Sequence, residues 1–195
     1  MKKFLPWIVI AIIAVGLYSW GKSFNNTAVG YEADAKTEWA KVESAYQRRA
    51  DLIPNLVATV KGYAEHEKET LEGVINARAQ ATKTTIDPSN LTAENMAQFQ
   101  QAQQGLSGAL SRLLVTVERY PDLKADASFL ELQSQLEGTE NRINVSRDRF
   151  NDAVNIYDKH IKEFPGMLLA GIFGFDEMPR YKSAPGSENA PKVEF

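Results

Sequence analysis

The first twenty residues constrain this chain more than any other part of its sequence. Lys2 and Lys3 precede a run from Phe4 to Trp20 that contains no charged residue. As a helix this run would be about 26 Å long, slightly less than the roughly 30 Å thickness of a bilayer hydrocarbon core. Lysine and aromatic side chains near both ends would cover the difference, because they reach the membrane interface. The run therefore predicts a transmembrane helix over about residues 4–20.

A cleaved secretory signal is the alternative interpretation of the same segment. A signal peptide needs small residues just before its cleavage site, whereas the run LYSWGKS that follows the apolar block is bulky. We therefore expect a retained, single-pass anchor within residues 1–24. Lys2, Lys3 and the amino terminus precede the segment and only Lys22 closely follows it. This asymmetry favours a cytoplasmic N-terminus with the following domain outside.

Composition excludes several classes of function. The formal net charge of −3 argues against nucleic-acid partners, because phosphate binding needs a basic face. The chain has no cysteine, which excludes disulfides, thiolate metal sites and cysteine nucleophiles. The stretch HEKET at residues 66–70 resembles a zinc-protease motif, but Thr70 stands where the second histidine ligand is needed. We expect no catalytic residue, no metal site and no cofactor.

Apolar periodicity after the anchor predicts helices. From about Thr27 to Ala81, apolar residues recur at spacings of mostly three and four. Pro54 lies inside this stripe and leaves its phase unchanged, which predicts one long helix with a kink at Pro54. A break into two helices at Pro54 is the alternative. Residues 82–92 predict a loop, and Thr92 begins a second helix that reaches about residue 120.

The second helix contains Gly105 and Gly108, which predict a close approach of a neighbouring backbone because glycine weakens a helix. A third helical segment covers about residues 126–164. It has a seven-residue repeat typical of a packed seam, formed by Leu136, Ile143, Phe150, Tyr157 and Phe164. The short connection at Tyr120-Pro121-Asp122 makes the adjacent helices antiparallel. The predicted fold class is therefore all-α, an antiparallel up-and-down helical bundle behind an N-terminal transmembrane helix.

Residues 166–175 are apolar but too short to span a bilayer. They predict a lid packed over one end of the bundle; the alternative is an exposed contact for a membrane surface or a second subunit. The bundle with this lid would occupy residues 25–181. The polar, proline-containing residues 182–195 are expected to be disordered.

A candidate polar cluster precedes the proline. Arg48, Arg49 and Asp51 lie just before Pro54, and position 49 falls on the apolar stripe. A charge at such a position must pair or reach solvent, because an unpaired buried charge is costly. The candidate partners on later helices are Glu118, Glu140 and Asp148.

Two interpretations of this cluster stay open. The first is an ion-paired group that fixes helix register. The second is a polar pocket beside the kink, where a carbonyl freed near Arg49 and Ala50 accepts a ligand or a partner's donor. Asn141, Arg142, Arg147 and Arg149 lie on or beside the third helix. We expect them to be solvated or paired with Glu137, Glu140 and Asp152 at helical spacing, and not to form a binding site.

Two motifs carry a family resemblance. The stretches RRADLIPNLV and ERYPDLK occur in this order, and the chain from the anchor to about Phe175 resembles the LemA family. The resemblance implies a short anchor followed by a four-helix antiparallel bundle in a bacterial cytoplasmic membrane. It implies no established enzymatic reaction. Relatives include a protein required for magnetosome biogenesis, and others are often encoded beside membrane-bound metalloproteases.

The leading functional hypothesis is a non-enzymatic scaffold or assembly factor. It would associate with itself or with an integral membrane protein, because a shared bilayer raises the effective concentration of weak contacts. The alternatives are an adaptor for membrane proteolysis and a small-molecule-sensing or enzymatic site near Arg49, Asp51 and Glu118.

Overall fold

The computed structural model describes residues 4–182, and residues 1–3 and 183–195 lie outside the described part. Every regular element in that part is helical, which confirms the all-α prediction. The elements are α1 (Leu5–Tyr63), α2 (Lys68–Lys83), a 3-10 turn η1 (Pro88–Asn90), α3 (Ala93–Val117), α4 (Pro121–Lys124), α5 (Ala127–Lys162) and α6 (Gly166–Phe173). The predicted disordered tail falls outside the described residues except for Lys182.

Helix α1 joins the apolar N-terminal run to the bundle without interruption. It contains 59 residues and includes Pro54, so it is about 90 Å long. The break that was the alternative at Pro54 is absent. The prediction of one helix to Ala81 is also wrong, because α1 ends at Tyr63 and α2 begins at Lys68. If the helix continued, its apolar residues after Tyr63 would extend past the neighbouring helices and stay exposed. The turn at residues 64–67 instead folds α2 back, so that these residues are buried.

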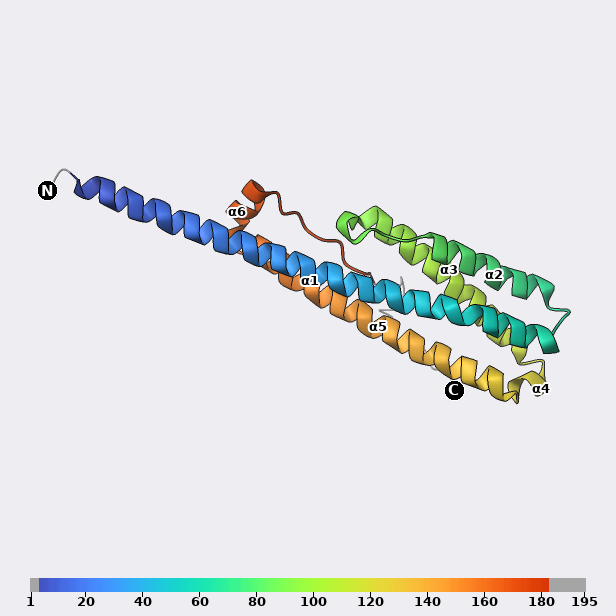
Figure 1. Cartoon of the computed structure of the whole chain (residues 1–195). Coiled ribbons are helices and arrows are strands. Elements are labelled where there is room, and N and C mark those ends of the chain that lie inside the picture. Colours follow the sequence, from blue (N-terminus) through green and yellow to red (C-terminus); the bar gives the residue numbers. More distant parts are fainter. Residues whose placement is uncertain (1–3, 183–195) are drawn as a thin grey trace, which may run out of the picture.

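The long helices run in alternating directions (Figure 1). Helix α1 lies along α5, and α2 lies along α3. The two pairs share a core at the end distant from the N-terminus, where Ile53 and Leu56 meet Leu106 and Leu113. Trp39 is fully buried in a second core, with the Phe99 and Phe150 rings packed edge-on against it. The core therefore extends along most of the bundle.

Side-chain capping sets two helix starts. Thr92 Oγ1 accepts from the Asn95 amide at 3.1 Å, which confirms the predicted start of α3. Asp126 accepts from the Phe129 amide at 2.9 Å and begins α5. Capping of this kind satisfies amides that have no partner inside the helix.

The seven-residue repeat of α5 is confirmed for Ile143, Phe150 and Tyr157, which are all buried. It is wrong for Phe164, which follows the end of α5 and is 80% exposed. The glycine prediction is also wrong, because no neighbouring atom lies within 4 Å of a Cβ placed at Gly105 or Gly108. Both glycines are exposed, so no close packing explains them.

The chain after α5 returns to α1. Helix α6 contacts both α1 and α5. Residues 174–182, here called the strap, then run back along the bundle (Figure 1). Asn151 on α5 holds the strap through two hydrogen bonds to Tyr181: its side chain accepts from the Tyr181 amide at 2.8 Å and donates to the carbonyl at 3.0 Å. The strap thereby brings Tyr181 to the middle of the bundle.

Candidate functional site

Arg49 is buried at the centre of a polar cluster that joins three helices. Its exposed fraction is 3%. One guanidinium nitrogen, Nη1, donates to Glu140 on α5 and to Ser107 on α3, each at 3.0 Å. The other, Nη2, donates to the Gln103 side-chain oxygen at 2.9 Å. We call Arg49, Gln103, Ser107 and Glu140 the Arg49 centre; its hydrogen bonds satisfy much of a charge that burial would otherwise penalise.

The structure places the predicted partners differently. Glu140 pairs with Arg49, although its own side chain is 49% exposed, so the pair opens to solvent on one side. Glu118 caps the end of α3 and pairs instead with Lys124 at 2.5 Å. Asp148 is exposed on α5. The set Arg49, Asp51 and Glu118 therefore does not form one pocket.

Sequence reasoning missed Gln103. It lies four residues after Phe99 and three before Leu106, on the apolar stripe of α3. A polar residue at such a position needs a buried partner. Its amide nitrogen donates to the Ala81 carbonyl at 3.3 Å, so Gln103 connects Arg49 to the end of α2. Its place on the stripe was the signal that could have identified it.

The carbonyl that Pro54 leaves without an amide donor is occupied from within the chain. Proline has no N–H, so the carbonyl of Ala50, four residues earlier, has no helical partner. Arg78 on α2 donates its Nε to that oxygen at 2.7 Å. The prediction of a freed carbonyl near Ala50 is therefore met, but Arg78 rather than a ligand fills it. Pro54 itself is exposed.

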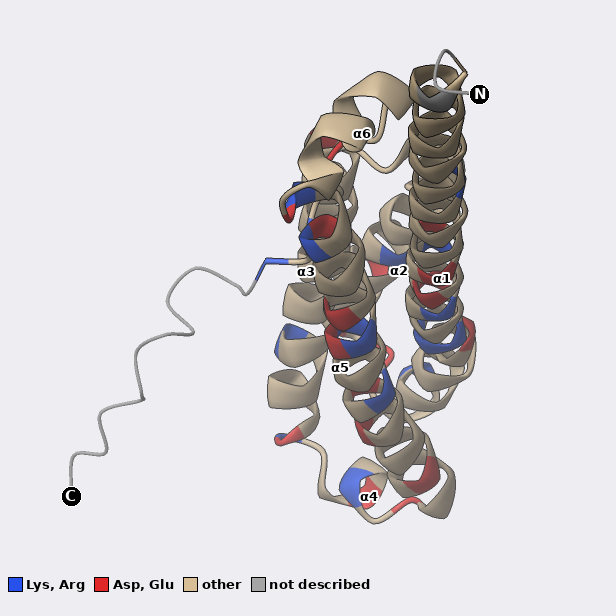
Figure 2. Cartoon of the chain, turned by 90° about the vertical axis from the view of Figure 1, so that its left-hand side faces the viewer, with Lys and Arg blue, Asp and Glu red and all other residues tan. Residues whose placement is uncertain are grey.

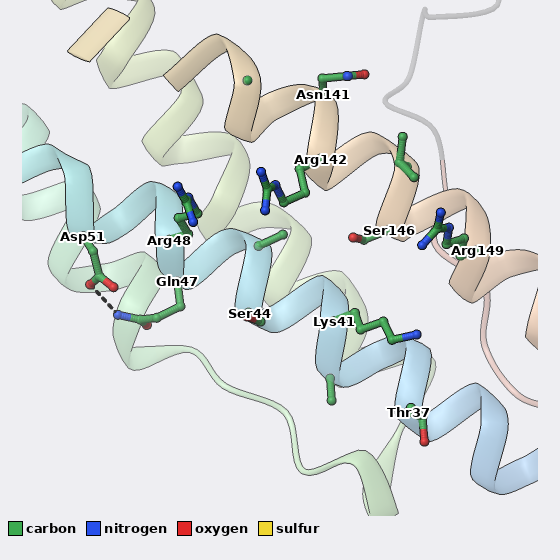
Figure 3. Close-up of a pocket in the computed structure, with 14 residues that line it drawn as sticks. Thr37, Lys41, Ser44, Gln47, Arg48, Asp51, Asn141, Arg142, Ser146 and Arg149 are labelled. Atoms are coloured by element: carbon green, nitrogen blue, oxygen red, sulfur yellow. Dashed lines mark hydrogen bonds between the residues drawn. The ribbon is translucent and has the colours of Figure 1, made fainter. Parts of the chain in front are cut away.

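Arg48 and Asp51 face the opposite side of α1, in a groove between α1 and α5 (Figure 3). We call this the outer groove, and its volume is about 1030 Å³. None of the residues that line it comes from α2 or α3. The polar and charged lining residues are Thr37, Lys41, Ser44, Gln47, Arg48, Asp51, Asn141, Arg142, Ser146 and Arg149.

The outer groove is basic. It is lined by four cationic side chains and one carboxylate. Asp51, the carboxylate, accepts from the Gln47 side chain at 2.7 Å. In residues 4–182, Arg48, Arg142 and Arg149 form no ion pair. Arg142 and Arg149 are exposed and unpaired, which fits the solvated alternative of the expectation, and both line the groove.

Arg147 has a different environment from its neighbours on α5. Its guanidinium lies 4.0 Å from the centre of the Tyr181 ring, a cation–π contact. The hydroxyls of Tyr181 and Tyr46 are 2.6 Å apart and buried. Burial raises the pKa of both tyrosines above the ordinary value. The strap thus covers the Arg49 centre beside Tyr46.

The described part of the chain contains no group of three or more His, Asp or Glu residues arranged to hold a metal ion. His66, in the protease-like stretch, is exposed at the turn between α1 and α2. The chemistry that the arrangement does offer is charge recognition: unpaired guanidinium groups on a fixed helical frame suit carboxylates and other anions.

The N-terminal part of α1 stands apart from the bundle. All side chains from Pro6 to Trp20 are exposed and most are apolar. Figure 2 shows this part of α1 free of charged residues, whereas positive and negative residues follow one another farther along the helix. In the described residues, α1 is the single helix long and apolar enough to cross a membrane. The molecule is thus an all-helical protein with one candidate membrane-spanning segment and a basic outer groove.

The chain belongs to the LemA family, whose sequence model matches residues 38–195. It is similar to magnetosome protein MamQ 2 of Paramagnetospirillum magneticum, with 24% identity over 92% of this chain and 71% of the relative. It is 27% identical to magnetosome protein MamQ of Magnetospirillum gryphiswaldense over 85% of this chain and 66% of the relative. It is 20% identical to protein LemA of Metamycoplasma hominis over 84% and 71% of the two chains.

Proposed function

We propose that this protein is a membrane-anchored assembly factor that acts through contacts and not through catalysis. Residues 4–20 would anchor it in the bacterial cytoplasmic membrane, with the bundle on the outer side. The outer groove would receive an acidic segment of a protein in the same membrane, either an integral membrane partner or a second copy. The similarity to proteins named for the magnetosome supports a membrane-associated role.

The observation that carries this proposal is the set of unpaired cations in the outer groove. Arg48 comes from α1, and Arg142 and Arg149 come from α5. Helix α1 and α5 hold the three side chains along one continuous surface (Figure 3). A carboxylate-bearing segment laid in the groove would pair with several guanidinium groups at once.

The position of the groove favours a protein partner over the lipid surface. Thr37 follows Trp20 by 17 residues, so the nearer end of the groove lies about 26 Å along α1 beyond the apolar run. Charges in physiological salt are screened over roughly 8 Å. Anionic headgroups beside Trp20 would therefore contribute little at Arg48, and the occupant must itself project from the membrane.

Crosslinking in intact membranes tests the proposal. The chain has no cysteine, so Ser44→Cys on α1 or Val145→Cys on α5 supplies a unique site in the outer groove for a photocrosslinker. Val115→Cys on α3, 73% exposed, is the control outside the groove. We expect adducts from the two groove positions, loss of those adducts in Arg48→Glu and Arg142→Glu variants, and none from position 115.

The contrary results are equally specific. Monomeric protein with no groove adducts in the membrane, or adducts that persist after charge reversal and in high salt, would refute contact through this groove. Substrate turnover by purified protein, abolished by one side-chain change, would replace the proposal with an enzymatic function. Labelling of the Val115→Cys variant by a membrane-impermeant thiol reagent on intact cells tests the proposed side of the bundle.

The contacts of Arg49, Asp51 and Glu118 support the small-molecule alternative less well than contact through the outer groove. Arg49 donates hydrogen bonds to residues of α3 and α5, Asp51 faces the outer groove, and Glu118 lies near Lys124. An adaptor for membrane proteolysis would also use a contact surface, so it is a special case of the proposed function in which the crosslinked partner is a protease.

A further inference from the structure

Helix α6 exposes an apolar surface at the end of the bundle nearest the N-terminus (Figure 1). Phe164 just before it is 80% exposed, and Leu168 and Ile172 are 59% and 74% exposed. Met167 and Phe173 are also exposed. Contiguous apolar surfaces of this kind on a folded domain usually mark a contact with a partner or a membrane.

One side of α6 is fixed firmly to the bundle. A Cβ atom added at Gly166 would lie 2.7 Å from the Phe24 ring and 3.1 Å from the carbonyl oxygen of His160. Glycine is therefore needed where α6 begins. Ala170, one turn later, is buried in the cluster around Phe24 and Ile161. Leu168 and Ile172 are exposed on the remaining sides of the helix.

Both ends of α6 approach the same turn of α1. Gly166 lies against Phe24, and a Cβ atom at Gly21 would lie 3.9 Å from the Phe173 ring. The Phe173 and Phe24 rings stack with their centres 6.5 Å apart. An eight-residue helix is about 12 Å long and would span two turns of α1 if it ran alongside. Both ends of α6 therefore contact α1 within residues 21–24.

This contact lies where the uncharged run ends. Gly21 directly follows Trp20, so α6 lies within about one helical turn, roughly 5 Å, of the end of the candidate membrane segment. If α1 stands along the membrane normal, α6 lies at the level of the membrane interface. Helix α6 itself contains no charged residue.

We infer that Phe164 and α6 form an interfacial membrane helix, which inserts its exposed apolar side chains at the boundary between lipid headgroups and acyl chains. The inference rests on the proposed anchoring of residues 4–20 and adds a second contact with the same bilayer. Interfacial helices bury their apolar face about 5–10 Å into this boundary. With α1 and α6 both engaged, the bundle has a fixed tilt, and the outer groove has a fixed height above the membrane.

The charges around α6 fit this position. Lys162 pairs with Glu177 at 2.7 Å, and Lys159 with Glu163 at 3.6 Å. These pairs lie on α5 and the strap next to α6, and they form a polar border with balanced charge. A bilayer is favoured over a second copy as the occupant because the apolar surface of α6 continues onto the exposed apolar run of α1.

Site-specific fluorescence in reconstituted vesicles tests the inference with the full chain. Leu168→Cys and Ile172→Cys each give a unique site for an environment-sensitive dye, because the chain lacks cysteine. Two matched positions are Ile12→Cys in the anchor and Val115→Cys at the opposite end of the bundle. The vesicles contain phosphatidylcholine and phosphatidylglycerol, with or without lipids that carry a nitroxide quencher on the acyl chain.

We expect dyes at positions 168 and 172 to shift to shorter wavelength and to lose intensity to shallow lipid quenchers. The dye at position 12 should be quenched best by deep quenchers, and the dye at position 115 by neither. Quenching at position 12 with none at 168 and 172 overturns the inference while anchoring stands. Absence of quenching at position 12 refutes the anchoring on which it rests.

A charge substitution separates insertion from simple proximity. Ile172→Glu should abolish the lipid quenching of a dye at position 168, because a carboxylate on the inserted face must return to water. Val115→Glu, at a site of similar exposure, should leave that quenching unchanged. If a dye at position 168 is shielded from both lipid and aqueous quenchers, and dilution with empty vesicles removes this shielding, a second copy of the chain covers α6. That result would overturn the inference.

Discussion

Arg48 and Arg49 are adjacent in the sequence and occupy opposite environments. Arg49 points into the bundle, where α3 and α5 supply its hydrogen-bond acceptors. Arg48 points into the outer groove and forms no ion pair with any other described residue. The same residue type therefore stabilises the fold at position 49 and presents an unpaired charge at position 48.

The contrast shows how a helical rod can divide stability from recognition. Successive residues on a helix point about 100° apart, so one short stretch of α1 contributes to the core and to the outer face. Hydrogen-bond partners from two other helices surround Arg49, and its loss would disturb the fold. The outer cations make few internal contacts, so evolution or experiment can alter them at little cost in stability.

The largest expected effect on stability comes from substitution of the buried Arg49. Arg49→Ala should lower the free energy of unfolding by about 2–4 kcal/mol, because it removes the partner of Gln103 and leaves a cavity. Arg48→Ala is the matched control and should change it by less than about 0.5 kcal/mol. Urea unfolding of the full chain in detergent, followed by circular dichroism, measures both. Equal effects of the two substitutions would remove the distinction between the environments.

The second effect concerns the Ala50 carbonyl, on the same inner side of α1. Arg78→Ala should cost about 1–2 kcal/mol, because it leaves a buried carbonyl without a donor. In a Pro54→Ala background the new amide of residue 54 can bond to Ala50, so the same substitution should cost about 1 kcal/mol less. The four proteins of this double-mutant cycle are compared by urea unfolding. Strict additivity would show that Pro54 and Arg78 act independently.

Periodicity in the sequence was sufficient to predict the all-α class and much of the buried surface, because helical burial repeats with the helical turn. It placed Ile143, Phe150 and Tyr157 in the core. It failed at the turn of residues 64–67, since AEHE contains neither glycine nor proline. A stripe that continues in phase after a turn cannot be distinguished from a longer helix without knowledge of its partners.

The site was less predictable for a similar reason. The sequence indicated that Arg49 needs a partner, but three carboxylates on later helices were compatible with that need. Only the arrangement of α3 and α5 selects Glu140 and adds Gln103. Helical spacing predicts only that the α5 arginines are solvated or paired, whereas the structure places Arg142 and Arg149 in one groove with residues of α1. The spacing of residues along one helix does not show which residues of a neighbouring helix a side chain will meet.

A smaller effect should appear at high pH on the inner side of the bundle. Burial raises the pKa of Tyr157 to about 12, and its hydroxyl donates to the Asp176 carbonyl at 2.9 Å. Because the folded pKa exceeds the unfolded value near 10, stability is complete below about pH 10 and declines as the pH rises toward about 12. Thermal unfolding across this range measures the decline. It should be shallower in Tyr157→Phe; an unchanged pH profile would contradict the assignment.

Substitutions in the outer groove should have the smallest effect on stability and the clearest effect on binding of an acidic segment. A double substitution, Arg48→Gln with Arg142→Gln, should leave the free energy of unfolding within about 0.5 kcal/mol of the parent protein, because both side chains are exposed. Poly-glutamate, as a probe for an acidic segment, should bind the parent protein and bind the variant about fivefold less tightly at low salt. Fluorescence anisotropy of labelled probe over a range of salt concentrations measures this binding.

The control is Lys61→Gln with Lys83→Gln, which removes two exposed charges outside the groove and changes the net charge by the same amount. If the control weakens binding as much as the groove variant, the probe senses only overall charge and the outer groove is not a recognition site.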